Sequence, residues 1–212
     1  MSFAIPRPTS TTFSVLTVCT GNICRSPLAE LHLRRGLSSV DDVNMSSAGT
    51  MAVDDDVMPD QARALARSLG LEPDEHRARF LFERDVRDAD LVLALAREHR
   101  RAVVSMHPRA SRYTFTLREA ARLARDVTDA QLAEALPSGG STGTDRLRAT
   151  VALLASRRGT VEAPDDPLDD DVVDPYRRSD ETFAESGRQL VPAADVLVDL
   201  LTRAAAIDGG DR

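Results

Sequence analysis

Aromatic residues and cysteines are scarce in this chain of 212 residues. Aromatic side chains make up 4% of it and tryptophan is absent, so a core must be built mainly from leucine, valine and alanine. Two cysteines cannot form a disulfide framework, and we expect a reducing, cytoplasmic compartment. No apolar run is long enough to span a membrane, and residues 1–13 lack the order of a signal peptide.

Basic residues are also too few to balance the acidic ones. The net charge is −7, which argues against a nucleic-acid partner because phosphate backbones attract basic surfaces. Any anion that this chain binds must therefore be held by a local concentration of positive charge.

Short apolar runs alternate with helical patterns along much of the chain. Residues 14–18, 43–48, 90–95 and 113–116 are predicted strands, and 27–36, 61–69 and 97–106 are predicted helices. This order predicts an α/β fold in three layers, with a doubly wound parallel sheet of about four strands and helices on both faces. Ligands of such sheets bind at the carboxyl ends of the strands.

Residues 117–160 have helical spacing without strands, which predicts a helical insertion in the sheet domain. Thr128 to Gln131 has the spacing of a helix capping box, and 137–143 is predicted to be a flexible connector. We expect the insertion to pack on the sheet edge, although a docking surface or an active-site lid is an alternative.

The domain boundaries follow from the ends of these patterns. We expect a single domain over 13–207, a disordered leader over 1–12 and a frayed tail over 208–212. A last helix is predicted from Ser179 onward, and Pro192 should kink or divide it.

The most informative segment is the loop of residues 19–26, Cys-Thr-Gly-Asn-Ile-Cys-Arg-Ser, between the first predicted strand and helix. A loop in this position can form an anion-binding nest of backbone N–H groups, with the helix N-terminus behind it. Arg25 can clamp two phosphate oxygens through its planar guanidinium. The loop thus predicts a phosphate site formed by Cys19 to Ser26.

Cys19 is the predicted nucleophile of this site. The helix N-terminus and Arg25 favour a thiolate, which can attack phosphorus. The Ser26 hydroxyl can stabilise that thiolate. Gly21 is expected to permit the tight loop conformation, and Asn22 can adopt a left-handed conformation and bridge the loop with its amide.

The string VCTGNICRSP resembles the phosphate-binding loop of low-molecular-weight protein tyrosine phosphatases, and longer actinobacterial-type chains are more similar still. The resemblance covers roughly residues 14–116 and 172–205. It implies phosphate binding by Thr20, Gly21, Asn22, Ile23, Cys24 and Ser26. It also implies catalysis by Cys19, Arg25 and a general acid in an Asp-Pro-Tyr triplet, present here as Asp174-Pro175-Tyr176. Asp169, Asp170 and Asp171 compete for that role but lack the Pro-Tyr context.

Further residues take roles only through the resemblance. It pairs His76 with Asn22 as a brace of the loop, and it pairs Cys24 with Cys19 in a reversible disulfide that protects the nucleophile. Tyr176 would form one wall of the substrate cleft. Residues 51–56 lack the aromatic residue that many tyrosine-specific members carry, so we expect a weaker phosphotyrosine preference. Ile23, where bacterial arginine phosphatases tend to have Thr, favours phosphotyrosine.

The combined prediction is a cytoplasmic enzyme that hydrolyses protein phosphotyrosine or another phosphomonoester through a phosphocysteine intermediate. It needs no cofactor or metal, because the mechanism requires none and no Cys/His cluster has metal-ligand spacing. Two alternatives are an arsenate reductase on the same scaffold and a silent phosphate-binding module. An arsenate reductase would need further cysteines, which this chain lacks. A silent binding module would not require an intact Cys19, Arg25 and Asp174.

Overall fold

The computed structural model describes residues 11–136 and 141–207. The predictions for most of the leader, part of the connector at 137–143 and the tail lie outside these residues. In the described part, four parallel strands form one sheet with the order β2-β1-β3-β4. They are β1 (Phe13–Cys19), β2 (Val43–Gly49), β3 (Leu91–Ala94) and β4 (Thr114–Thr116). The predicted parallel sheet of about four strands is confirmed.

The two central strands carry the apolar runs noted in the sequence. All four residues of β3 are buried, and so are six of the seven in β1, as expected for strands covered on both faces. The register places Cys19 at the end of β1 opposite Gly49 at the end of β2. The first predicted site residue therefore lies at the carboxyl edge of the sheet.

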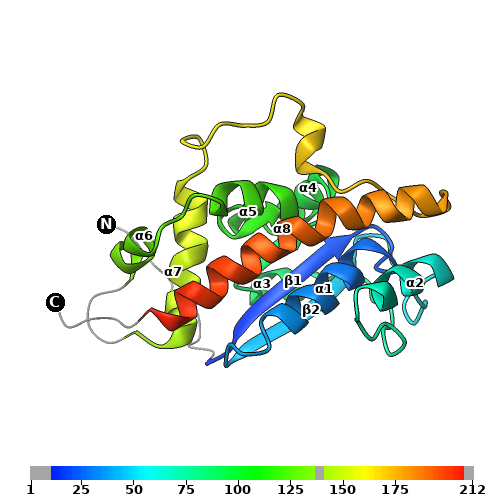
Figure 1. Cartoon of the computed structure of the whole chain (residues 1–212), viewed down its shortest axis with the longest axis horizontal. Helices are drawn as coiled ribbons and strands as arrows, with labels where there is room; N and C mark the ends of the chain where they lie inside the picture. The colour runs from blue at the N-terminus through cyan, green and yellow to red at the C-terminus, as the bar shows by residue number, and fades with distance from the viewer. Residues whose placement is uncertain (1–10, 137–140, 208–212) are drawn as a thin grey trace.

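Helices cover both faces of the sheet, which gives the predicted three layers (Figure 1). Helices α1 (Arg25–Gly36) and α8 (Asp180–Ala206) pack against each other on one face. On the other face, α3 (Glu83–Asp88) packs against α4 (Arg97–Met106). A further helix, α2 (Asp60–Ser68), contacts α8 beside the sheet.

The segment after β4 is helical, as its pattern indicated. It contains α5 (Leu117–Ala124), α6 (Asp129–Ala135) and α7 (Gly143–Ser156), and Thr128 and Gln131 form the predicted capping box. All three helices contact α8. In addition, Arg148 of α7 forms an ion pair with Asp90, whose other carboxylate oxygen accepts a hydrogen bond from the Ser14 backbone. The insertion thus supports the start of β1.

Two features of the helices differ from the prediction. Pro192 lies inside α8 and does not divide it, because the helix continues from Asp180 to Ala206. The reason is packing, because Leu190, Ala194 and Leu197 are buried around an exposed Pro192. Helix α3 was not predicted, since its six residues are mostly charged and only Val86 is buried. None of the helices described is both long and apolar enough to cross a membrane.

Candidate active site

The loop at residues 20–24 joins β1 to α1, and the end of β2 holds it in place. The Thr50 N–H donates to the Cys19 carbonyl at 3.0 Å, and the Met51 N–H donates to the Thr20 carbonyl at 2.9 Å. Helix α1 then begins at Arg25. The loop therefore lies where a strand ends and a helix begins, which is a favourable place for an anion.

Asn22 organises the interior of this loop. Its side chain is fully buried and its φ angle is 54°, a left-handed conformation. The amide nitrogen donates to Ser26 Oγ at 2.9 Å and to Ser47 Oγ at 2.8 Å, and the amide oxygen accepts from the Arg79 N–H at 2.9 Å. Asn22 thus connects three separate segments, as its residue type suggested.

The role expected of Gly21 is filled by other residues. Gly21 is not among the described residues with positive φ, and a Cβ placed on it would meet only the Ile23 side chain at ordinary contact distance. The glycine that the loop needs is Gly49, where a Cβ would lie 2.5 Å from the Thr20 oxygen and 2.9 Å from the Asn22 nitrogen. The close approach of β2 to the loop was not evident from the spacing of the motif.

The Cys19 thiol faces the loop interior and is 2% exposed as a residue. Its sulfur lies 3.0 Å from Ser26 Oγ and accepts a hydrogen bond from the Asn22 N–H at 3.3 Å. Thr17 in turn donates to the Ser26 carbonyl at 2.9 Å. The Ser26 hydroxyl and the Asn22 N–H thus fix the position of the sulfur inside the loop.

Arg25 connects the loop to the segment after α7. Its buried guanidinium donates to the Val172 carbonyl at 3.2 Å and forms an ion pair with Asp174 at 2.9 Å. The Asp174 side chain is 52% exposed. The structure thus brings a residue 149 positions further along the chain (174 − 25) to the loop, as the sequence prediction requires.

Two of the competing carboxylates are engaged elsewhere. Asp170 pairs with Arg122 at 2.9 Å, and Asp171 accepts from the Arg97 backbone and side chain. Tyr176 is 43% exposed, next to Asp174, with the Arg177 guanidinium 5.0 Å from its ring centre. Met51 opens the segment 51–56, which lacks the aromatic residue of many tyrosine-specific members, and it is 74% exposed.

His76 lies against the loop. Its Nε2 is 2.7 Å from the Asn22 carbonyl oxygen, so the contact with Asn22 is made through the backbone. Burial lowers the pKa of this histidine. Glu30 and Ser47 extend the same network, with Ser47 Oγ donating to Glu30 at 2.5 Å and Arg34 pairing with Glu30. The sequence analysis did not single out Glu30, which looks like an ordinary residue of a helix.

His99 on α4 is a further residue of the site that no motif in the sequence indicates. This histidine is 2% exposed, and its Nε2 lies 2.8 Å from Thr20 Oγ1. Burial lowers its pKa to about 3, with the nearby positive charge of Arg25 acting in the same direction. Glu98 lies 3.4 Å away but is 71% exposed, so its effect is weakened by solvent. His99 is therefore a neutral imidazole that holds the first side chain of the loop.

Cys24 differs from Cys19 in its surroundings. Both are free thiols, but burial and the neighbouring negative charge raise the pKa of Cys24 to about 12. Cys24 is therefore protonated at neutral pH and is no competing nucleophile. In the described ranges 11–136 and 141–207, no group of three or more His, Cys, Asp or Glu residues could hold a metal ion.

Comparison with known proteins agrees with this geometry. Residues 14–157 match the family described as low molecular weight phosphotyrosine protein phosphatase. Etp of Escherichia coli K12, a low molecular weight protein-tyrosine-phosphatase, is 37% identical over 95 residues, which are 45% of this chain and 62% of that protein. A protein-arginine-phosphatase of Geobacillus stearothermophilus is 30% identical over 153 residues, 70% of this chain and 97% of that protein.

A solved low molecular weight protein tyrosine phosphatase from T. tengcongensis is 27% identical, with a TM-score of 0.60 over 89% of this chain and 99% of its own. This chain spans less than two thirds of the length of some curated relatives, 65% for one from Klebsiella pneumoniae. The family match covers more than half of the 212 residues. The chain therefore belongs to the low molecular weight phosphotyrosine protein phosphatase family.

Proposed function

We propose that this protein hydrolyses phosphomonoesters, above all protein phosphotyrosine, through a phosphocysteine intermediate on Cys19 with Asp174 as general acid and base. The observation that supports this most is the 2.9 Å ion pair between Arg25 and Asp174. Because of this ion pair, the Asp174 carboxylate lies beside the loop that contains the buried Cys19 thiol. Family membership supports a cysteine-based phosphatase, and the residue roles rest on the geometry.

In the first step, the Cys19 thiolate attacks phosphorus in line with the leaving oxygen. The S–P bond forms as the P–O bond breaks, and Asp174 gives its proton to the departing oxygen. The Arg25 guanidinium and the loop N–H groups stabilise the equatorial oxygens, where charge is concentrated in the transition state. Ser26 and Asn22 each form a hydrogen bond with the Cys19 sulfur, and the Asn22 amide donates to Ser26 Oγ. These contacts hold the loop in place.

In the second step, Asp174, now a carboxylate, takes a proton from water. The resulting hydroxide character allows the water oxygen to attack phosphorus, and the S–P bond breaks to release inorganic phosphate. Cys19 leaves as a thiolate, stabilised by the Ser26 hydroxyl at 3.0 Å. The cycle balances without a metal, an oxidant or a cofactor.

The substrate class has one specific alternative. The relative matched over 97% of its length is named a protein-arginine-phosphatase, which makes phosphoarginine a second candidate. Ile23 and the exposed Tyr176 beside Asp174 support phosphotyrosine, since an aromatic wall can stack on a phenol ring. We place the enzyme in the cytoplasm because both of its cysteines are free.

The test is turnover of p-nitrophenyl phosphate and phenyl phosphate between pH 5 and 7 without added metal. Cys19→Ser should abolish turnover. Asp174→Ala should slow phenyl phosphate by about 10²–10⁴-fold and p-nitrophenyl phosphate less, because nitrophenolate leaves readily without a proton. Asp169→Ala is the matched control and should behave as the wild type. Equal effects on both substrates would refute the acid role of Asp174, and an inactive wild type would favour a binding module.

A parallel comparison of phosphotyrosine and phosphoarginine peptides separates the two substrate classes. A higher kcat/KM for phosphotyrosine supports the proposal. A higher value for phosphoarginine would instead assign this chain to the second class.

A further inference from the structure

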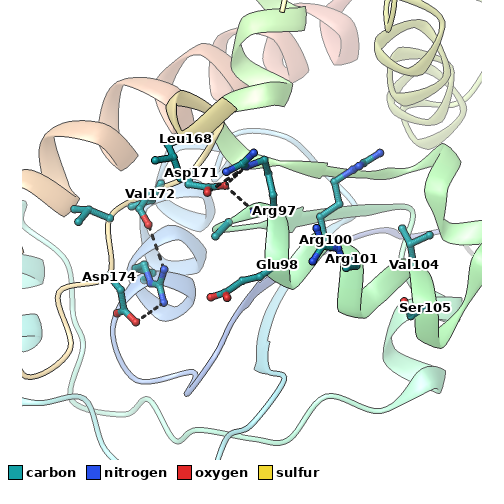
Figure 2. Close-up of a pocket in the computed structure, with 13 residues that line it drawn as sticks. Arg97, Glu98, Arg100, Arg101, Val104, Ser105, Leu168, Asp171, Val172 and Asp174 are labelled. Atoms are coloured by element: carbon teal, nitrogen blue, oxygen red, sulfur yellow. Dashed lines mark hydrogen bonds and ion pairs between the residues drawn. The ribbon is translucent and has the colours of Figure 1, made fainter. Parts of the chain in front are cut away.

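A cavity of about 830 Å³ opens beside the proposed catalytic residues and is not used by the mechanism described above. It lies between α4 and the segment around residues 168–174, and Arg25 and Asp174 form one end of its lining. Figure 2 shows this arrangement, with Arg97 directed toward Asp171, and with Arg100 and Arg101 beyond Glu98 on the side away from Asp174. The cavity is therefore continuous with the place where a substrate would react.

The basic residues of the cavity differ in how far their charge is balanced. Arg97 pairs with Asp171, and that carboxylate also caps the first N–H of α4. Arg100 donates to the Thr114 carbonyl and lies 3.6 Å from Glu119. Arg101 is exposed, and among residues 11–136 and 141–207 no carboxylate is within ion-pair distance of it. The guanidinium of Arg101 is thus available to a ligand.

The chain has no lysine, so all 27 of its basic residues are arginines. An arginine fork binds a carboxylate or a phosphate with two parallel hydrogen bonds. The opposite side of the cavity includes Leu168, which is 61% exposed, and α4 contributes Val104. The lining therefore combines an anion-binding group with apolar surface for the methylene groups of a side chain.

We propose that this cavity is a subsite for an acidic side chain located near the phosphorylated residue of a protein substrate, with Arg101 as its main cation. The proposal rests on the proposed function, because it concerns the substrate of the same site. Glu98 also lines the cavity and lies between Asp174 and the two residues Arg100 and Arg101 in Figure 2. It repels an acidic group there, so the ligand is held toward Arg101.

The test compares two phosphotyrosine peptides that differ only in flanking residues, Glu and Asp in one and Gln and Asn in the other. Binding to Cys19→Ser protein is measured by fluorescence anisotropy, so that the readout does not depend on turnover. The Cys19→Ser protein without further changes, here the wild-type background, should prefer the acidic peptide by about two- to fivefold at low salt. This is the preference expected for one solvent-screened ion pair. The preference should disappear at about 0.5 M NaCl, where the Debye length is short.

Added to that background, Arg101→Gln should abolish the preference and Glu98→Gln should increase it. Arg109→Gln is the matched control, since Arg109 is exposed, lies outside the cavity and carries the same charge. The ratio of the two peptides' Kd values is taken within each variant, so a change in affinity that is common to both peptides cancels. An equal loss in Arg101→Gln and Arg109→Gln would show a general field effect and overturn the subsite, as would a wild-type background without preference.

The two proposals fail separately. Inactivity toward p-nitrophenyl phosphate with an intact acidic preference would refute the hydrolysis and leave the binding site. Full hydrolytic activity without an acidic preference would refute only the subsite.

Discussion

Replacement of Asn22 should cost more stability than replacement of any other single residue of the phosphate loop. The side chain is fully buried and makes three hydrogen bonds, to Ser26, Ser47 and the Arg79 backbone. Its backbone is also in the left-handed region, at φ 54°. Asn22→Ala removes all three bonds and leaves buried polar groups without partners.

The size of the effect follows from these contacts. Each buried hydrogen bond contributes about 1 kcal/mol net, and a left-handed conformation costs a residue with a Cβ about 1 kcal/mol or more. Asn22→Ala should therefore lower the free energy of unfolding by about 4 kcal/mol. Asn22→Gly loses the same hydrogen bonds but not the favourable conformation, so it should lower it by about 3 kcal/mol.

The assay is urea unfolding of both variants, followed by circular dichroism, with p-nitrophenyl phosphate turnover measured on the folded fraction. A loss below about 1 kcal/mol in Asn22→Ala would refute the role of Asn22 as the organiser of the loop. If Asn22→Gly were less stable than Asn22→Ala, the left-handed backbone would not hold in solution.

Three other residues give independent predictions. Gly49→Ala should destabilise the protein by about 2 kcal/mol or more and reduce turnover, because the new Cβ would lie 2.5 Å from the Thr20 oxygen; Gly143→Ala, with no atom within 4 Å, is the matched control, and similar losses in urea unfolding would contradict the argument. Burial lowers the pKa of His99 to about 3, so the unfolded state takes up a proton below pH 6.5 and the native state does not. The stability advantage of wild type over His99→Asn should accordingly shrink as the pH falls, by about 3 kcal/mol between pH 7 and 4, and a constant difference would refute it. Burial raises the pKa of Cys24 to about 12, so iodoacetamide at pH 7.5 should modify Cys19 alone, as read by mass spectrometry. Peroxide should nevertheless inactivate the wild type reversibly with dithiothreitol and Cys24→Ser irreversibly; identical recovery would exclude a protecting disulfide.

The sheet could be predicted because its strands are short apolar runs bounded by polar residues. Runs such as 14–18 and 90–95 are typical of strands that are buried on both faces at the centre of a parallel sheet. Helix α3 was missed because short charged helices depend on their neighbours and not on a pattern of their own. The predicted division of the last helix at Pro192 was wrong for the opposite reason, since local preference gave way to the buried residues around it.

The phosphate loop could be predicted because its residues are adjacent in the sequence. The choice of Asp174 as a residue of this site needed a family resemblance, as nothing in the spacing relates it to the loop, and its ion pair with Arg25 was not predicted. His99, Glu30 and Gly49 could not be found by spacing, because each acts through a contact with a distant segment. Gly21 was assigned a role that belongs to Asn22 and Gly49, since a glycine in a loop motif does not show which residue has the unusual backbone.

The ion pair between Arg25 and Asp174 has a consequence for the order of events during binding. The cation that a phosphate dianion needs is occupied by the side chain proposed to donate the proton. An arriving dianion would therefore exchange one ion pair for another, and part of its attraction would be used to release the carboxyl group. Asp174, once released from Arg25, would be free to turn toward the leaving oxygen of the substrate. Substrate entry and the release of Asp174 would then be one event, and in the empty site Asp174 stays paired with Arg25.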